Sequence, residues 1–568
     1  MQTYLIKLDE FAGIVDQGLA VTWLERIAFV FLVLMVLSAP HSIAATQTAW
    51  LTGMTAWLVA TVLRWKADRS LFSSSAPFGL RVSLLLFFGW SIVTTVTSYA
   101  PDISASKLRG VAVFFIFYFV IHNIRNLRVA HFLVFALIAS CMINVLWMPV
   151  QRLIGRGVEM HGLAPESPLA RARLIEGDTL LTANGTKVSS PEDVLAAIEA
   201  NEITKIKFYR PDFEFVVDVK RSDLLEGGDA LSRLGFSSWK KSSNWRSSGF
   251  YGHYTTYAEV LQLIASIVLG LFVGSFASRW KTGNADGDTG SPRVAASLRL
   301  PVIMFLCLIA MSFALLLTVT RASQLAFLIS GAVIVLVGLG RKWFLVAGLI
   351  GLPIALAGLL FLQQSRQVGF FDPNDDSIKW RQTVWREGFD LWTASPQHFA
   401  LGVGMDSIKR YAPQWHMFDD GRLNMGHFHS TPLNLVVERG LPALLLWLMV
   451  LGVYARTLWK GLTKIHDPKS RGIILGCLGG MVGFFASGLV HYNLGDQEVA
   501  MMFFMLMGIG VRVVEEGSFE SVGSVESVGS GESVGSVGSG ESVGSVGSIE
   551  SIESIESIES VESVGYVG

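Results

Sequence analysis

Long apolar stretches alternate with short polar segments along most of the chain. A helix needs roughly 17–25 mostly apolar residues to cross the hydrocarbon layer of a membrane, because each buried backbone group must be satisfied within the segment. About twelve stretches meet this criterion, and each predicts a transmembrane helix. The predicted spans cover residues 23–39, 46–63, 80–100, 108–121, 130–150, 258–277, 300–318, 324–340, 343–361, 441–458, 472–490 and 499–514.

The composition agrees with this pattern. Of the 568 residues, 51% are hydrophobic and 16% are charged, which is more apolar surface than one soluble core can bury. All three cysteines, Cys141, Cys307 and Cys477, fall inside predicted spans, so they indicate neither a disulfide framework nor a cysteine metal site. The predicted fold class is therefore an all-α polytopic membrane protein, in which residues 1–153 form an N-terminal five-helix region.

The distribution of Lys and Arg predicts the orientation of the chain. Basic residues follow the even-numbered spans, as at Arg64, Arg125, Arg341 and Lys460, and short basic loops stay on the cytoplasmic side. Both termini are therefore expected in the cytoplasm, and no cleavable signal is evident. Two long loops, residues 151–257 and 362–440, then face outward.

The C-terminal segment, residues 515–568, has a different composition. It repeats Ser-Val-Gly and Ser-Ile-Glu triplets, a period that suits neither a helix face nor a strand face, so we expect a disordered, low-complexity cytoplasmic tail. The remainder of the chain has 45 basic and 35 acidic residues, and the orientation signal accounts for this excess without nucleic-acid binding. The tail is either a partner-binding arm or a repeat without function.

The first outer loop contains a small α+β unit at residues 156–222. Asn184-Gly185 is a strong turn signal between two strand-like runs, and Ser190-Pro191 is a helix start. The order of these motifs, with a short helix around Pro168 before them, resembles a PDZ domain. The residues LIGRGVEM match the carboxylate-binding loop of that family poorly. The resemblance therefore implies a periplasmic insert that either captures a protein partner or serves as a spacer.

An insert of this kind in a multi-span protein suggests an intramembrane metalloprotease as one alternative. That chemistry needs two His residues one helical turn apart with a Glu between them, and no HExxH occurs. The acidic residues of the second outer loop, among them Asp372, Asp375 and Asp419, have no repeating ligand spacing. We therefore expect no metal site and no cofactor.

Four motifs in and around the second outer loop resemble the O-antigen ligase and polymerase superfamily. From His429 the chain reads HSTPLNLVVERGLP, in which Leu433, Glu438 and Gly440 have the spacing of the family signature, while Ser430 replaces its usual Asn. The other motifs are WRQTVWREGFDLWTASPQHFALGVG with Arg381, LTVTRASQLAFL with Arg321, and NWRSSGFYGHYTTYAEVLQL with Arg246, His253 and Tyr254. The resemblance covers residues 246–514. It implies a catalytic periplasmic loop at residues 362–440 in a bacterial inner-membrane protein.

The resemblance also implies an activity. Such a glycosyltransferase moves a glycan from a polyprenyl-diphosphate donor to a hydroxyl of a lipid, glycan or protein acceptor, inverts the anomeric centre and uses no metal. Ligases, polymerases and protein O-oligosaccharyltransferases share these motifs, so the acceptor stays open. Two other classes remain as alternatives, a polysaccharide or lipid transporter and a membrane scaffold built around the PDZ-like unit. A transporter should contain paired half-repeats or intramembrane acids, and Glu259 is the one candidate for the latter.

The departing diphosphate needs cationic partners, and the planar fork of arginine binds phosphate oxygens in pairs. On a helix that contains Arg381, the aromatic residues Trp385, Phe389 and Trp392 lie within about 80° on the same face, whereas Arg386 lies off it and should be solvated. The candidates for binding the donor diphosphate are Arg246, Arg321 and Arg381.

His429 is the predicted catalytic base, because an imidazole that titrates near neutrality can accept the proton of the acceptor hydroxyl. His427 is the alternative. Glu438 would project about 180° away from His429 on a continuous helix, so we expect it to pair between helices or to cap the bend at Gly440. The candidates for lining the same cavity are His253, Tyr254, His427, Glu438, His491 and Asp496.

Overall fold

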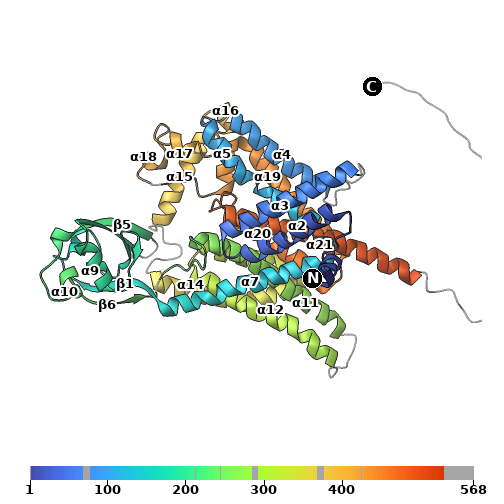
Figure 1. Cartoon of the computed structure of the whole chain (residues 1–568), viewed down its shortest axis with the longest axis horizontal. Helices are drawn as coiled ribbons and strands as arrows, with labels where there is room; N and C mark the ends of the chain where they lie inside the picture. Colours follow the sequence, from blue (N-terminus) through green and yellow to red (C-terminus); the bar gives the residue numbers. More distant parts are fainter. Residues whose placement is uncertain are drawn as a thin grey trace, which may run out of the picture. The chain divides into compact units, whose positions relative to one another are not determined.

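The computed structural model describes residues 2–67, 77–210, 213–243, 245–283, 292–366, 376–423 and 425–529. Long helices pack side by side, and the strands gather with short helices in a unit of their own (Figure 1). The helices before and within the bundle are α1 (Gln2–Ala12), α2 (Leu19–Ser38), α3 (Ile43–Ala67), α4 (Phe78–Val96), α5 (Pro101–Val111), η1 (Ala112–Phe114), α6 (Phe115–Asn123), α7 (Leu127–Ile154), α11 (Tyr254–Gly283), α12 (Pro292–Leu317), α13 (Arg321–Leu339), α14 (Arg341–Arg366), α19 (Thr431–Lys464), α20 (Pro468–Gly488) and α21 (Gln497–Gly529).

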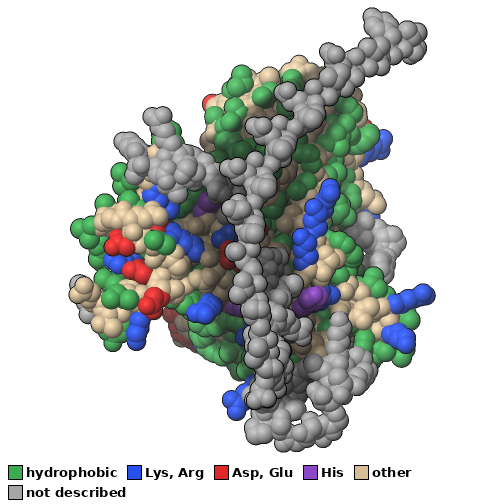
Figure 2. All heavy atoms as spheres, turned by 90° about the vertical axis from the view of Figure 1, so that its right-hand side faces the viewer, with side chains coloured by type: hydrophobic (Ala, Val, Ile, Leu, Met, Phe, Trp, Pro, Cys, Tyr) green, Lys and Arg blue, Asp and Glu red, His purple; other side chains and the backbone are tan. Residues whose placement is uncertain are grey.

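Each of the twelve predicted spans overlaps these helices, although the third runs past the end of α4 at Val96. Within the described residues, ten segments are long and apolar enough to cross a membrane, with α5 and α6 counted as one segment from Pro101 to Asn123. Helices α3 and α14 are not among these ten. The multi-pass membrane protein is thus confirmed, whereas the orientation stays a prediction. Figure 2, a view from the right-hand side of Figure 1, shows hydrophobic side chains on the flanks and scattered Lys and Arg side chains on the visible face.

Helices α11 and α20 approach each other through glycines. A methyl group added at Gly270 or Gly274 of α11 would lie less than 3 Å from the backbone of α20, and the same holds in reverse for Gly472 and Gly476. Small residues let membrane helices pack backbone to backbone, where no hydrophobic effect drives their association. This contact fixes the start of α11 next to the end of α20, where several candidate site residues lie.

The strands form one antiparallel sheet in the order β5-β4-β2-β1-β6, with β3 paired to β2. The turn at Asn184-Gly185 and the helix after Ser190 occur where the sequence predicts them, and Ser190 and Asp193 form a capping box. The elements of this unit are β1 (Arg156–Leu163), α8 (Pro168–Arg171), β2 (Thr179–Ala183), β3 (Thr186–Lys187), α9 (Pro191–Glu199), β4 (Ile203–Arg210), β5 (Phe213–Lys220), η2 (Arg221–Asp223), α10 (Ala230–Leu234) and β6 (Phe236–Ser242).

The predicted boundary of this unit at residue 222 is wrong, because α10 and β6 complete the sheet unit. Gly235 ends α10 in the left-handed region with φ 75° and turns the chain into β6, which pairs with β1. The strand escaped the sequence analysis because its sequence, FSSWKKS, has few apolar residues to alternate with polar ones.

One longer and three short helices precede α19 and form a small core against its first turns, centred on Val384, Val403 and Phe428. Gly402 and Gly404 have φ values of 71° and 97°, and a side chain at Gly402 would collide with the backbone of α19. The paired glycines therefore let this segment lie directly on α19. The four helices are α15 (Asp376–Thr393), α16 (Pro396–Leu401), α17 (Ile408–Tyr411) and α18 (Met417–Asp420).

The prediction of a disordered tail from residue 515 is wrong at its start, because α21 continues to Gly529. Adding a residue to an existing helix contributes one hydrogen bond per residue fixed, so a membrane helix can propagate into a weak sequence. Arg512 also pairs with Glu515 and Glu516 across one helical turn. Residues 530–568, with Asp372 and Asp375, lie outside the described residues.

Candidate active site

The predicted base His429 lies in the turn immediately before α19. Ser430 caps the helix by accepting a hydrogen bond from the backbone N–H of Leu433. His429 itself has φ 48°, so it is not part of the helix, and the continuous helix assumed for the Glu438 argument does not exist. Its backbone N–H donates to Nδ1 of His427 at 3.2 Å, and the two rings lie 4.1 Å apart. We call these two residues the histidine pair.

The ring of His429 is partly buried and packs edge-on against Trp380, with ring centroids 4.9 Å apart. Burial, together with the smaller effects of the charges of His427 and Arg381, lowers the pKa of His429 to about 3. Burial likewise lowers the pKa of His427 to about 4. Both rings are therefore neutral at neutral pH and can accept a proton.

Arg381 lies on α15 beside this pair, with its guanidinium 4.4 Å from the ring of Trp380. Trp385, on the same face, donates from Nε1 to the carbonyl oxygen of Phe428 at 3.0 Å and so ties α15 to the histidine turn. The predicted solvent exposure of Arg386 is confirmed. Arg381 thus contributes positive charge next to His429.

Arg246 and His253 both stack on Tyr254, at 4.5 Å and 4.4 Å from its ring. Tyr254 begins α11, so this group lies at the start of that helix. The candidate residues His491 and Asp496, in the turn between α20 and α21, lie near the same end of the bundle. The charge of Arg246 lowers the pKa of His253 in addition to the larger effect of burial. His253 in turn influences His429 electrostatically, which relates this group to the histidine pair.

Arg152, which the sequence analysis missed, connects the Arg246 segment to the turn before Arg321. Its guanidinium donates to the carbonyl oxygens of Trp245 and Leu317 and to the hydroxyl of Ser247. The backbone N–H of Ser247 also donates to the Leu317 carbonyl at 3.0 Å. Arg321 begins α13 four residues after Leu317. The sequence did not indicate this contact, because Arg152 precedes the sheet unit and the other residues follow it.

The turn between α20 and α21 joins the same region. His491 Nδ1 lies 2.6 Å from a carboxylate oxygen of Glu259, and its carbonyl oxygen accepts from the backbone N–H of Thr431. Asp496 accepts a hydrogen bond from Thr256 at 2.5 Å. The structure therefore brings His491 and Asp496 to the start of α11, together with Glu259, which the sequence analysis did not assign to the site.

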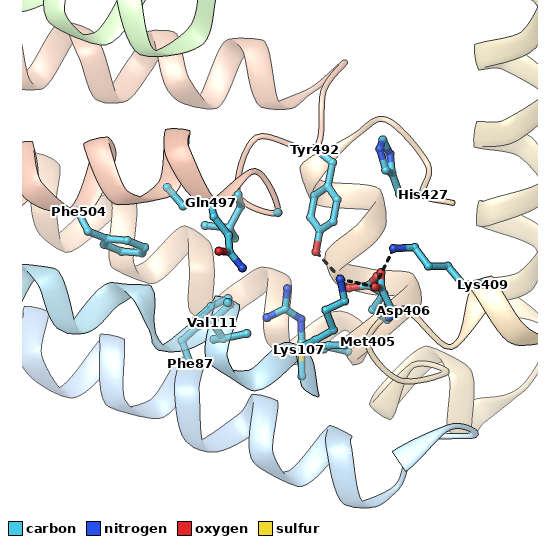
Figure 3. A pocket seen from close by; sticks show the side chains of 16 residues that line it. Phe87, Lys107, Val111, Met405, Asp406, Lys409, His427, Tyr492, Gln497 and Phe504 are labelled. Atoms are coloured by element: carbon cyan, nitrogen blue, oxygen red, sulfur yellow. Dashed lines mark hydrogen bonds and ion pairs between the residues drawn. The ribbon is translucent and has the colours of Figure 1, made fainter. Parts of the chain in front are cut away.

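A cavity of about 160 Å³ lies next to His427 of the histidine pair (Figure 3). His427 lines it, whereas His429 does not. Of the predicted residues, Glu438 also lines it. The remaining lining residues are Phe87, Lys107, Gly110, Val111, Met405, Asp406, Lys409, Arg439, Tyr492, Leu494, Gly495, Gln497, Ala500 and Phe504.

Glu438 is buried and accepts hydrogen bonds from the hydroxyl of Tyr492 and the backbone N–H of Asp406, both at 3.2 Å. Glu438 was expected to pair between helices or to cap the bend at Gly440, and its two partners instead lie in the connections between α16 and α17 and between α20 and α21. The predicted bend is also present, since Gly440 has φ 71° inside α19. Burial raises the pKa of Tyr492, so its hydroxyl keeps the proton that it donates.

Lys107 is a site residue for which the sequence did hold a signal. It lies between the third and fourth predicted spans, in a connection that the charge distribution predicts to be external. A basic residue there departs from the bias that keeps short basic loops in the cytoplasm. Within the described residues, no group of three or more His, Cys, Asp or Glu side chains could hold a metal ion, and metal independence stays a prediction.

The fold and the site define a multi-pass membrane protein with a polar, basic region at one end of its helices. Residues 306–448 match the family model of the O-antigen ligases. The matched segment includes Arg321, Arg381 and His429, and it covers about a quarter of the chain. No curated protein matches the chain. The family match supports a membrane glycan-transferring enzyme of this superfamily.

Proposed function

We propose that this protein transfers a glycan from a polyprenyl-diphosphate carrier to an acceptor hydroxyl at the outer face of the bacterial inner membrane. The observation that carries the proposal is the neutral histidine pair next to Arg381, within the segment that matches the O-antigen ligases. A base beside a cation suits a reaction in which a hydroxyl loses a proton and a diphosphate departs.

Arg381, Arg321 and Arg246 bind the donor diphosphate in this proposal. Guanidinium groups keep their charge in a partly dry site and bind phosphate oxygens in pairs, so no metal is required. Arg152 holds the Arg246 segment against the turn that leads to Arg321, which brings two of the three arginines into one region. Negative charge that develops on the leaving diphosphate is stabilised there.

His429 accepts the proton of the acceptor hydroxyl. The acceptor oxygen forms a bond to the anomeric carbon, the bond from that carbon to the diphosphate oxygen breaks, and polyprenyl diphosphate leaves with the electron pair. A single displacement of this kind inverts the anomeric centre. Binding of the anionic donor favours the protonated imidazole and so raises the pKa of His429 from its low value toward neutrality.

The sheet unit is the part that we propose to contact a protein partner at the periplasmic side. Its strand β6 pairs with β1 alone and is an edge strand of the sheet. Extended peptides bind by adding a strand to such an edge. In this respect the edge strand suits the PDZ-like role that the motif order suggests.

The experiment is an analysis of glycans and their carriers in a strain that lacks the gene. Intact chains left on the polyprenyl carrier indicate a ligase of lipid or protein acceptors, and mass spectrometry of lipid and protein glycans then identifies which. Lost chain length indicates a polymerase. Unchanged glycans and carriers would contradict the proposed function.

A further inference from the structure

Two lysines from distant segments share one carboxylate oxygen at the edge of the cavity. Lys107 Nζ of α5 lies 2.6 Å from Asp406 Oδ2, and Lys409 Nζ of α17 lies 2.9 Å from the same atom. Figure 3 shows both ammonium groups directed at Asp406 below Tyr492 and His427. We call Lys107, Asp406 and Lys409 the lysine cluster.

The lysine cluster has one unbalanced positive charge. Burial raises the pKa of Asp406, but the hydrogen bonds and charges of both lysines outweigh this effect and leave the pKa lowered, so the carboxylate is ionised at neutral pH. The side chains of Lys107 and Lys409 are 47% and 48% exposed, whereas that of Asp406 is 9% exposed. Each ammonium therefore has further protons available for a ligand.

Arg439 adds a second, independent indication of a ligand. It is 2% exposed and lines the cavity, with Nη1 donating to Ser91 and the guanidinium over the ring of Phe87. Within the described part of the chain, its Nε is buried and has no hydrogen-bond partner. A buried donor without an acceptor is costly, and an acceptor oxygen of a ligand would satisfy it.

The lysine cluster and Arg381 act on different members of the histidine pair. His427 lines the cavity and is influenced electrostatically by Lys409 and Asp406. His429 is influenced by Arg381 and His253 instead, and it does not line the cavity. One imidazole thus lines the cavity with the lysine cluster and the other is next to Arg381, an arrangement that suits a reaction with two substrates.

We propose that this cavity binds an anionic group, a phosphate or a carboxylate, of the acceptor. This assignment rests on the proposed function, in which the donor diphosphate occupies the arginine side. The anionic group contacts the lysine cluster and Arg439, and the acceptor hydroxyl then lies near His427 and His429. Phe87, Val111 and Phe504 also line the cavity and offer apolar contacts to the rest of the acceptor.

The first test measures binding of radioactive inorganic phosphate to the full-length chain in nanodiscs by equilibrium dialysis. Replacing both lysines (K107Q with K409Q) is expected to weaken one class of phosphate sites by at least about tenfold, because two charge-assisted contacts are lost. The arginine pair K107R with K409R should retain binding. Arg410→Gln is the matched control, since Arg410 neighbours Lys409 but bonds to Asp102 outside the cavity. Unchanged phosphate binding in the glutamine variant would overturn the proposal.

Two further experiments identify the chemical class of the anionic group and the substrate that carries it. If glucuronate displaces the bound phosphate and methyl phosphate does not, the anionic group of the acceptor is a carboxylate. If methyl phosphate displaces it and glucuronate does not, the group is a phosphate. In a transfer assay, the glutamine variant is expected to raise KM for the acceptor and not for the donor. A rise confined to the donor KM would overturn the assignment to the acceptor. Failure of the proposed catalytic role of His429 would appear separately, as transfer that persists in His429→Ala.

Discussion

Glu259 and His491 form a buried hydrogen-bonded pair, with a carboxylate oxygen 2.6 Å from Nδ1 of the imidazole. Their side chains are 3% and 13% exposed, and they come from α11 and the turn before α21. The carbonyl oxygen of His491 also accepts the first backbone N–H of α19, from Thr431. One contact therefore links three helices directly behind the turn that carries the histidine pair.

Replacing Glu259 with Gln keeps the size of the side chain and removes its charge. A hydrogen bond to a charged group contributes about 1.5–3 kcal/mol, so we expect transfer activity to fall by about tenfold or more as His491 and the start of α19 lose their orientation. Activity is measured in membranes with equal amounts of protein. The control is Glu515→Gln, which removes another paired carboxylate, at the opposite end of the span that begins at Gln497. Equal losses in both variants would contradict a specific role for the pair.

Arg381 and Arg386 provide a matched comparison on one helix. Arg381→Lys retains the charge but loses the planar fork, and Arg381→Gln loses both, so we expect transfer to fall moderately in the first and about 100-fold in the second. Arg386 is exposed, and Arg386→Gln should remain close to wild type. Initial rates of transfer from the lipid-linked donor check this order. If the Arg386 variant loses as much activity as the Arg381 variant, the assignment of the donor site is wrong.

The low pKa values of His427 and His429, about 4 and about 3, predict how stability depends on pH. Imidazoles of the unfolded chain titrate near ~6.5, so between about pH 6.5 and 4 the unfolded state binds more protons than the folded state. Stability should therefore decrease as the pH falls through this range. Thermal unfolding in detergent at pH 7.5 and pH 5 should show a smaller decrease for the double variant H427Q with H429Q. The exposed His416→Gln should behave as the wild type, and an equal decrease in all three proteins would refute the prediction.

The bend of α19 at Gly440 predicts a local destabilisation. Gly440 has φ 71°, and a methyl group there would collide with the carbonyl of Ala400. Gly440→Ala should therefore cost more than about 1–2 kcal/mol, the strain of a left-handed residue alone. Gly452 in the same helix has open space around its Cα, and Gly452→Ala should be neutral or stabilise by up to about 1 kcal/mol. The unfolding midpoints of Gly440→Ala and Gly452→Ala are compared in detergent. Similar midpoints would contradict the predicted strain at Gly440.

The long apolar stretches were sufficient to locate the long helices, because each membrane helix satisfies its own backbone hydrogen bonds and so leaves a local signal. The turn at Asn184-Gly185 could also be predicted, because its signal lies in two adjacent residues. Strand β6 was missed because its pairing with β1 depends on residues far apart in the sequence. The last helix was predicted to end too early, at Val514, because its propagation beyond this residue depends on the preceding span.

The candidate site was predicted in part. Its motif residues follow one another closely, so Arg381, His427, His429 and Glu438 could be selected from the sequence. Lys107 and Glu259 are more than 200 and more than 100 residues away from Arg381, and tertiary packing alone brings them to the site. The helical geometry assumed from His429 to Glu438 failed because the backbone of His429 is left-handed and lies outside α19.

In the proposed mechanism, His429 takes the acceptor proton during glycan transfer. The most direct test is transfer of glycan from the polyprenyl-linked donor by His429→Ala, with His416→Ala as the control on an exposed histidine of the same loop. General-base catalysis contributes about 10²–10⁴-fold, so we predict at least a 100-fold loss for His429→Ala at equal protein level and no loss for the control. Full transfer activity in His429→Ala would contradict the mechanism.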